Sequence, residues 1–271
     1  YDVLLVGRRL RNSRTLQPRK YRMHRMRLLF DRGALFYAEY NLTLFFFLLT
    51  HRYDLVVSND LDTLAGACCA DRIRHPFSRA HHLHDCHEYF RGVPELVGRK
   101  TVTAVWKRIE DRIFPKLRAV VAVNKSVADL YTSEYGNPIG IVRNVPFRKS
   151  LSGAMDKTQL GIREDQKVII YQGAVNVDRG LEEAILAMKH LETDAVLVIA
   201  GIGDIFDSLK TFVTSNGLDY RVRFTGQIPF QQLHSLTLAA DLGLSIEKDV
   251  SVNYHFCLPN KFLDYIQANI P

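Results

Sequence analysis

Four short runs of apolar residues in the second half of the sequence predict a parallel β-sheet. They span residues 167–172, 195–200, 222–225 and 242–246. Each run is almost continuously apolar, as expected of strands that are covered on both faces. Between the first two runs, apolar residues repeat at helical spacing at Leu181, Ile185, Met188 and Leu191. This alternation predicts βαβ units.

The first half shows the same alternation less clearly, with strands expected at 2–6, 54–58, 80–83 and 119–123. The segment 143–153 (RNVPFRKSLSG) combines Pro, Gly and Ser with charges and has no apolar period, which is typical of a linker. We therefore predict an α/β protein of two Rossmann-like, doubly wound domains that face a cleft. The expected division is an N-terminal domain at 1–147, a linker at 148–166 and a C-terminal domain at 167–271.

Two loops that follow predicted strands are rich in glycine. Ligands of open α/β sheets lie beyond the carboxyl ends of the strands. The loop Gly173–Gly180 (GAVNVDRG) offers backbone amides and Arg179 at a helix entrance, which suits a diphosphate, although a plain connection is equally consistent. In the second loop, Gly201 and Gly203 allow the backbone to approach a ligand or make a structural turn, and Asp204 is the expected N-cap of the next helix.

The segment Leu258-Pro259-Asn260-Lys261 predicts a helix start with a cation in its first turn. A cation there opposes the helix dipole, and a bound anion would remove the conflict. Asp264, one turn later, could accept hydrogen bonds from sugar or ribose hydroxyls. The alternative is an exposed lysine. Either way, Lys261→Glu is expected to be neutral or slightly stabilising in the empty protein.

Titratable residues crowd the end of a predicted strand at residues 81–88 (HHLHDCHE). Neighbouring ligands in one short segment rarely surround a zinc ion, so no metal site is predicted. An acid/base or acceptor-positioning site suits three of them better, namely Asp85, His87 and Glu88. Asn59 and Asp60 end the preceding strand and face the same edge.

Positive charge is concentrated in the first half. Residues 1–150 carry 26 Lys and Arg against 14 Asp and Glu, whereas residues 151–271 carry 10 against 15. Ten of the basic residues fall between Arg8 and Arg32, which favours peripheral contact with an anionic membrane. A solvated surface is the plain alternative. A nucleic-acid-binding module is another, but no aromatic residues alternate with the basic ones, so we expect no nucleic acid partner.

The longest apolar run, Leu42–Leu49, is well short of the roughly 20 residues that span a membrane. We therefore expect no transmembrane segment. The four cysteines, at positions 68, 69, 86 and 257, have neither disulfide-framework nor zinc spacing, which favours a reducing cytoplasm. No signal peptide is recognised, and the first residues already resemble a strand.

Taken together, the motifs resemble the family-4 type of retaining glycosyltransferases with the GT-B fold, especially bacterial members of surface polysaccharide biosynthesis. The resemblance follows the order of DLVVSNDLDTL, HDCHEYF, RNVP, IIYQGAVNVDRGLEEAI, VIAGIGD and LPNKFLDYIQANIP. It implies that a nucleotide-diphosphate sugar binds the C-terminal domain and a lipid-linked or saccharide acceptor the N-terminal one. It also implies no metal and no cofactor, with a location in the cytoplasm at the inner face of the cell membrane.

The resemblance also assigns roles to individual residues. Those expected around the donor are Gly173, Arg179, Gly201, Gly203, Ile228, Leu258, Asn260, Lys261 and Asp264. Among them, Arg179 and Lys261 would hold the diphosphate, Asp264 the ribose, and Ile228 would lie near the base. His87 would be the active-site histidine, with Glu88 and Asp85 beside it, while Asn59 and Asp60 would face the acceptor.

The sequence departs from the family pattern in several places. The family's paired glutamates map to Phe256 and Asp264, so the first acid is missing, and Ala174 replaces a frequent arginine. Both ends of the intact enzyme are also missing by this comparison, so the fragment is expected to be inactive alone. A GT-B nucleotide-sugar 2-epimerase is the alternative enzyme.

Overall fold

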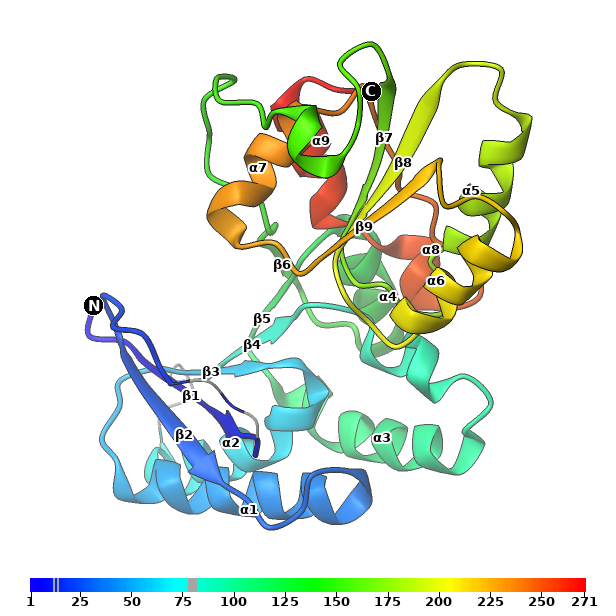
Figure 1. Cartoon of the computed structure of the whole chain (residues 1–271). Coiled ribbons are helices and arrows are strands. Elements are labelled where there is room, and N and C mark those ends of the chain that lie inside the picture. The colour runs from blue at the N-terminus through cyan, green and yellow to red at the C-terminus, as the bar shows by residue number, and fades with distance from the viewer. Residues whose placement is uncertain (12, 14, 78–81) are drawn as a thin grey trace. The chain divides into compact units, whose positions relative to one another are not determined.

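The computed structural model describes residues 1–11, 13, 15–77 and 82–271 (Figure 1). The chain divides into two compact units, Tyr1–Arg143 and Asn144–Pro271, each described here by itself. The segment 148–166, expected to be a linker, is part of the second unit. Its Ile162 is 1% exposed in a core cluster, with Met155 and Leu160 packed against the same cluster. Apolar side chains thus fix this segment to the second unit.

The second unit is a four-stranded parallel sheet of order β10-β7-β8-β9 with helices on both faces (Figure 1). Its elements are η4 (Lys157–Leu160), β7 (Lys167–Gln172), α5 (Leu181–Ala187), η5 (Met188–His190), β8 (Ala195–Ala200), α6 (Phe206–Ser215), β9 (Val222–Gly226), α7 (Phe230–Leu238), β10 (Leu242–Gly243), α8 (Val252–Phe256) and α9 (Asn260–Ala268).

Alternate residues of β8 enter two separate cores. Leu197 and Ile199 pack in the cluster that contains residues of α5 and α6, whereas Val196 and Val198 pack in the cluster of α7 and α9. All four side chains are fully buried. The continuously apolar sequence of this strand therefore reflects coverage of both faces, and the doubly wound prediction is confirmed for this unit.

Helix and strand ends are where the sequence reading and the structure differ. β7 and β8 have the predicted bounds, but β10 covers only Leu242–Gly243 of the expected 242–246. Helix α6 begins at Phe206, so Asp204 is not its N-cap. The Asp204 amide instead donates to Asn176 Oδ1 (3.2 Å), which holds the loop after β8 against the loop after β7.

The first unit contains a parallel sheet of order β3-β4-β5-β6 and a separate parallel pair, β1-β2. The strand expected at 80–83 is observed as β4, and positions 80 and 81 lie outside the described residues. The elements are β1 (Leu4–Arg9), β2 (Arg22–Arg27), α1 (Gly33–Thr50), β3 (Val56–Asn59), α2 (Asp60–Arg74), β4 (His82–Cys86), η1 (Phe90–Gly92), η2 (Pro94–Leu96), α3 (Lys100–Ile113), η3 (Phe114–Lys116), β5 (Ala119–Ala122), α4 (Lys125–Tyr135) and β6 (Gly140–Ile141).

Helix α1 is longer than the apolar run read from the sequence. Over its 18 residues the mean hydropathy is 1.2, so by length and composition alone it could cross a membrane. One face packs on α2, where Leu44 and Leu48 share a cluster with Ala67 and Ala70. The two backbones nearly touch, since a Cβ at Gly66 would lie 2.5 Å from the Asn41 carbonyl oxygen. One side of α1 is therefore committed to protein packing.

Candidate functional site

The strand order of the second unit fixes where a ligand can bind. The chain runs from β7 outward to β8 and β9 and then returns to place β10 on the other side of β7. In open α/β sheets the binding crevice lies at such a reversal, beyond the carboxyl ends of the two strands. Here those ends lead into the loop that starts at Gly173 and into the segment 244–247.

Two cations and one carboxylate meet at this point. Arg179 Nη1 donates to Glu247 Oε1 (3.2 Å), and the Lys261 ammonium forms an ion pair with the same oxygen. Both cations also lie over aromatic rings, Arg179 over Tyr254 at 4.6 Å and Lys261 over Tyr171 at 4.1 Å. The side chains of Lys261 and Glu247 are only 7% and 6% exposed. The cluster therefore keeps one net positive charge in a buried position.

Close backbone packing brings Arg179 to this cluster. Gly180 adopts φ 71°, and a Cβ there would lie 2.3 Å from the Ile246 carbonyl oxygen. The Lys248 amide also donates to the Asp178 carbonyl (2.9 Å), so the loop before α5 and the segment after β10 are joined on both sides of Arg179. Only glycine permits this approach. The guanidinium position is therefore set by the backbone.

Burial and pairing act in opposite directions on the two charged partners. Burial lowers the pKa of Lys261, and the Glu247 carboxylate offsets part of this effect. Burial raises the pKa of Glu247, but the close ammonium group of Lys261 outweighs this effect and holds that pKa below its usual value. Glu247 is therefore ionised at neutral pH, and its negative charge favours the ammonium form of Lys261.

The start of α9 adds backbone donors beside these cations. Pro259 is its N-cap and makes no side-chain cap, so the first amides lack a capping acceptor from that residue. Leu258 and Asn260 flank the start and are exposed, as needed for their amides to meet a ligand. Among the described residues, the buried Lys261 ammonium has no hydrogen bond of good geometry, although it contacts Glu247. Unused donors and a buried cation together suit an anion.

Two sequence expectations for this helix need correction or addition. Lys261 is buried and paired, so it is not the exposed lysine of the plain alternative. The expectation that Lys261→Glu is neutral in the empty protein considered the helix dipole alone. With Glu247 beside Lys261, we now expect this substitution to destabilise the fold, because a glutamate there would face Glu247. Glu247 itself was missed. It directly follows the apolar run 242–246, and the rule that ligands lie beyond strand ends could have found it.

The glycines of the two loops serve mainly to bring those loops together. A Cβ at Gly201 would lie 1.8 Å from the Gly173 carbonyl oxygen, and one at Gly203 would lie 2.3 Å from that of Val175. The Gly173 amide donates to Ala200 O (2.9 Å) and the Val175 amide to Ile202 O (3.1 Å). The loop amides were expected to be free for a phosphate, and for these two residues that expectation is wrong.

Asp264 lies one turn into α9 at the end of β7. It accepts a hydrogen bond from Gln172 Nε2 (3.0 Å), and Lys149 Nζ lies 3.8 Å from its other oxygen. Its side chain is 16% exposed, which leaves an oxygen for a ligand hydroxyl. Ile228 lies between β9 and α7 and packs against the core cluster of α7 and α9. The second unit thus positions Asp264 close to the α9 start by direct contacts.

A pocket of about 600 Å³ adjoins the segments that carry Arg179 and Glu247, since Gly180 and Ile246 line it together with Glu183 and Lys248. Its lining includes Ile169, Ala184, Ala187, Met188, Leu191, Leu244 and Ile246. These apolar side chains do not suit a diphosphate, and no residue assigned to the donor from the sequence lines this pocket.

In the first unit, the structure brings together residues from the ends of two neighbouring strands. Asn59 of β3 pairs in register with Asp85 of β4. The His87 amide donates to Asp60 Oδ1 (2.8 Å), and His87 Nε2 lies 3.1 Å from Asp85 Oδ2. The histidine side chain is 40% exposed. The expectation that these residues lie at one edge is confirmed in geometry.

Asp60 has two unusual properties. It begins α2 with φ 56°, a left-handed conformation that costs energy for most residues but less for Asp and Asn. Burial, together with the nearby charge of Glu88, raises the pKa of Asp60 to about 7, although the His87 amide opposes this. Asp60 therefore exchanges its proton near neutral pH.

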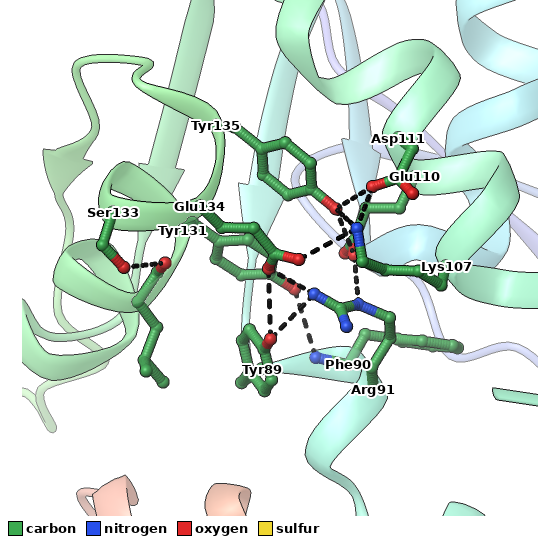
Figure 2. Close-up of polar contacts among 11 residues, drawn as sticks. Tyr89, Phe90, Arg91, Lys107, Glu110, Asp111, Tyr131, Ser133, Glu134 and Tyr135 are labelled. Carbon is green, nitrogen blue, oxygen red and sulfur yellow. Dashed lines mark hydrogen bonds and ion pairs between the residues drawn. The ribbon is translucent and has the colours of Figure 1, made fainter. Parts of the chain in front are cut away.

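A polar network fixes the segment that follows these residues (Figure 2). Arg91 forms ion pairs with Glu110 of α3 and Glu134 of α4, and its Nη2 donates to the Tyr89 hydroxyl (2.7 Å). Tyr135 also donates to Glu110 (2.9 Å), whose side chain is 1% exposed. Two helices therefore hold η1, and with it the end of the segment that carries His87.

The other described histidines of this segment point into the protein. The Ser58 hydroxyl is 2.8 Å from His82 Nε2 and 2.9 Å from His84 Nδ1, and all three residues are buried. Burial lowers the pKa of His84 to about 3. His81 lies outside the described residues. Among the described ones, no three His, Cys, Asp or Glu side chains form a metal-binding group.

The chain is similar in fold to several solved structures. It is similar to HepE of Anabaena, solved in complex with UDP and glucose, at 17% identity and a TM-score of 0.66, covering 92% of this chain and 66% of HepE. It is similar to WaaG, a glycosyltransferase involved in lipopolysaccharide biosynthesis, at 14% identity and a TM-score of 0.68, covering 95% and 69%. Sucrose-phosphate synthase of Thermosynechococcus elongatus matches at 18% identity and a TM-score of 0.65, covering 89% and 64%.

The two units have the GT-B fold. Residues 154–245 also match the family model of glycosyl transferases group 1. The match includes Arg179 and the glycine loops but ends before Glu247 and Lys261. An uncharacterized glycosyltransferase of Methanocaldococcus jannaschii is 29% identical over 135 residues, which are 45% of this chain and 35% of the archaeal protein. The match spans about a third of that relative.

Proposed function

We propose that this GT-B chain transfers a hexose or related sugar from a nucleotide-diphosphate sugar to a lipid-linked or saccharide acceptor, with retention at the sugar carbon. Support comes from the group 1 family match at 154–245, from the GT-B fold, and from the UDP bound by HepE. The type of chemistry also fits bacterial surface polysaccharide biosynthesis in the cytoplasm, at the inner face of the cell membrane.

The observation that carries the proposal is the pair of cations at the start of α9. Arg179 and Lys261 share the single carboxylate of Glu247, so both retain capacity for a second anion. A diphosphate beside them would also accept hydrogen bonds from the first backbone amides of the helix. Asp264, one turn along, would then accept hydrogen bonds from the ribose hydroxyls.

The same cations explain how the leaving group would be stabilised. When the sugar departs, negative charge grows on the diphosphate, and fixed cations in a buried site stabilise that charge more than water does. Arg179 and Lys261 thereby supply what a divalent metal supplies elsewhere. We expect the reaction to need neither a metal nor a cofactor.

In the first unit, we assign the acceptor side to Asn59 and Asp60 and the groups near the donor sugar to His87, Glu88 and Asp85. The support is local: His87 is held by Asp60 through its amide and by Asp85 through its ring. Asp60 can hold or release a proton near neutral pH, which suits contact with an acceptor hydroxyl.

The test is a transfer assay in EDTA on a protein that contains this chain at the full length of its GT-B relatives, with a panel of nucleotide sugars and with saccharide or lipid-linked acceptors. We expect acceptor-dependent release of nucleoside diphosphate, reduced about 100-fold or more in Arg179→Gln or Lys261→Gln. The matched control is Lys189→Gln, an exposed lysine bonded to Asn216, which should not change the rate. An epimerised sugar without acceptor, or full activity in both site variants, contradicts the proposal.

A further inference from the structure

The outward face of α1 is apolar and exposed. Leu35, Leu42 and Phe46 are 61%, 58% and 56% exposed. They are spaced seven and four residues apart, so they lie along one face of the helix. Leu29 and Phe30, just before the helix, are 84% and 42% exposed. These five residues are called the α1 stripe below.

Hydrogen bonds to Glu39 and packing of α1 on α2 hold the α1 stripe in place. The amides of Leu29 and Phe30 both donate to the Glu39 carboxylate, at 2.8 to 2.9 Å, which fixes these residues beside the first turns of α1. The opposite face of α1 packs on α2 through Leu44 and Leu48. Figure 1 shows α1 running along the outside of the first unit. The helix can thus offer one face to a partner but cannot be surrounded by lipid.

Basic residues adjoin the stripe. Arg27 and Arg32 bracket Leu29 and Phe30 in the sequence, and both are exposed. The Arg8 guanidinium lies over the Phe36 ring at 4.5 Å and donates to the Asp31 carbonyl (3.0 Å), which places β1 beside the start of α1. The described basic residues of this part that are exposed are Arg8, Arg9, Arg11, Arg19, Lys20, Arg22, Arg27 and Arg32.

We propose that the α1 stripe inserts into the boundary between head groups and acyl chains of an anionic bilayer, with α1 lying in the membrane plane. α1 is apolar on both faces, but α2 covers one of them, so the α1 stripe is the apolar face left to meet the acyl chains. The neighbouring basic residues would then lie at the level of the anionic head groups. The charge decides the occupant. Arg11 and Arg22 already pair with Asp31 and Asp2, but an apolar protein surface over the stripe would leave Arg27 and Arg32 unmatched, whereas anionic head groups match them. This goes beyond attachment by charge alone and does not depend on glycosyl transfer.

The experiment measures partition of the full chain onto vesicles of phosphatidylcholine with phosphatidylglycerol, at low and high salt. Leu42→Gln with Phe46→Gln should weaken binding at least about tenfold at both salt concentrations, because apolar transfer is not screened. Arg27→Gln with Arg32→Gln should weaken it by about tenfold or more at low salt only. The control pair, Ile73→Gln with Val105→Gln, changes residues that are 61% and 58% exposed on α2 and α3. It should leave binding unchanged.

Insertion itself is measured with Leu42→Trp, because the single native tryptophan, Trp106, is 8% exposed in the core. Lipids brominated near the head-group boundary should quench the fluorescence of the added tryptophan. The proposal is overturned if the Leu42/Phe46 pair and the Ile73/Val105 control pair change vesicle binding equally. It is also overturned if high salt abolishes all binding, or if the brominated lipids do not quench the added tryptophan. It is also overturned if the stripe pair instead abolishes self-association in sedimentation without changing vesicle binding.

Discussion

Lys261 lies in the first turn of α9, where a cation opposes the helix dipole, and the buried carboxylate of Glu247 keeps it there. The sequence shows the conflict at Lys261 but not its local partner, because Glu247 is 14 positions away and reaches it only through the return of the chain to β10. The local sequence therefore predicts correctly that Lys261 begins a helix, but it does not predict that the side chain is buried and paired.

Replacement of Glu247 tests this description of the cluster. Glu247→Gln leaves the buried Lys261 and the partly buried Arg179 close together without a counter-charge, so the free energy of unfolding should fall by about 3–5 kcal/mol. A nucleoside diphosphate should then stabilise the variant more than the native chain, because it restores the missing negative charge. Urea unfolding with and without ligand measures both.

The control for this variant is Glu183→Gln, which removes an exposed carboxylate paired with Lys248 and should have little effect. Equal loss of stability in the two variants, or equal stabilisation by diphosphate in Glu247→Gln and the native chain, would show that Glu247 does not neutralise the two cations.

Asp60 gives a pH dependence with a defined sign. Its pKa is raised from 3.8 to about 7 in the folded protein, so the folded state binds the proton more tightly than the unfolded state. The stability that this provides is complete below about pH 4 and is lost as the pH rises through about 7. Relative to Asp60→Asn, the native free energy of unfolding should therefore fall by roughly 2–4 kcal/mol between these pH values.

Asparagine suits this test because it tolerates the left-handed backbone and can still accept from the His87 amide. The measurement is urea unfolding of both proteins across pH 4 to 8. Parallel curves would mean that Asp60 titrates normally and does not have the role near neutral pH assigned to it.

At the scale of the elements, sequence patterns predicted the strands of the second unit better than the loops. β7 and β8 have their predicted bounds because their side chains are buried on both faces, which leaves a continuous apolar run. The loop at 173–180 was predicted to offer free amides to a diphosphate, whereas the amides of Gly173 and Val175 donate to carbonyls of Ala200 and of Ile202 in the loop after β8. Contacts between two loops depend on tertiary packing, which the local sequence does not record.

The contact between these loops can be broken by one methyl group. Gly201→Ala should lower the free energy of unfolding by at least about 3 kcal/mol, because the Cβ would overlap the Gly173 carbonyl oxygen and φ is 151°. Gly217→Ala is the control: φ there is 64°, but nothing lies within 4 Å of the added Cβ, so only about 1 kcal/mol of strain is expected. Similar losses from the two substitutions would show that the loops can separate without cost.

Helix α1 illustrates a second limit at this scale. The sequence reading weighed only the run Leu42–Leu49, but the helix also includes residues 33–41. Apolar residues occur on nearly every face of α1, so the spacing of its apolar residues does not predict which side of the helix is buried. Only the packing of Leu44 and Leu48 on α2 distinguishes the covered face from the exposed one.

For the whole molecule, the alternation of strands and helices was enough to predict two α/β units, and the resemblance of the motifs to a glycosyltransferase family added the GT-B fold. The alternation was not enough to place the boundary, which falls at Arg143 and Asn144 because the segment around Ile162 packs in the second unit. The separate β1-β2 pair was also not foreseen, since strand periodicity does not state which strands pair. The excess of basic residues in the first half could be counted in the sequence, but only the structure shows that part of it lies beside the exposed apolar α1 stripe.

The central claim is that the second unit holds a diphosphate between Arg179, Lys261 and the start of α9. Calorimetric titration in EDTA with a nucleoside, its monophosphate and its diphosphate tests it most directly, with uridine compounds first because HepE binds UDP. The account predicts tighter binding with each phosphate in the native chain. In Lys261→Gln, diphosphate binding should weaken by at least about 2 kcal/mol while nucleoside binding is unchanged. Unchanged diphosphate affinity in that variant, or binding that disappears in EDTA and returns with manganese, would contradict the account.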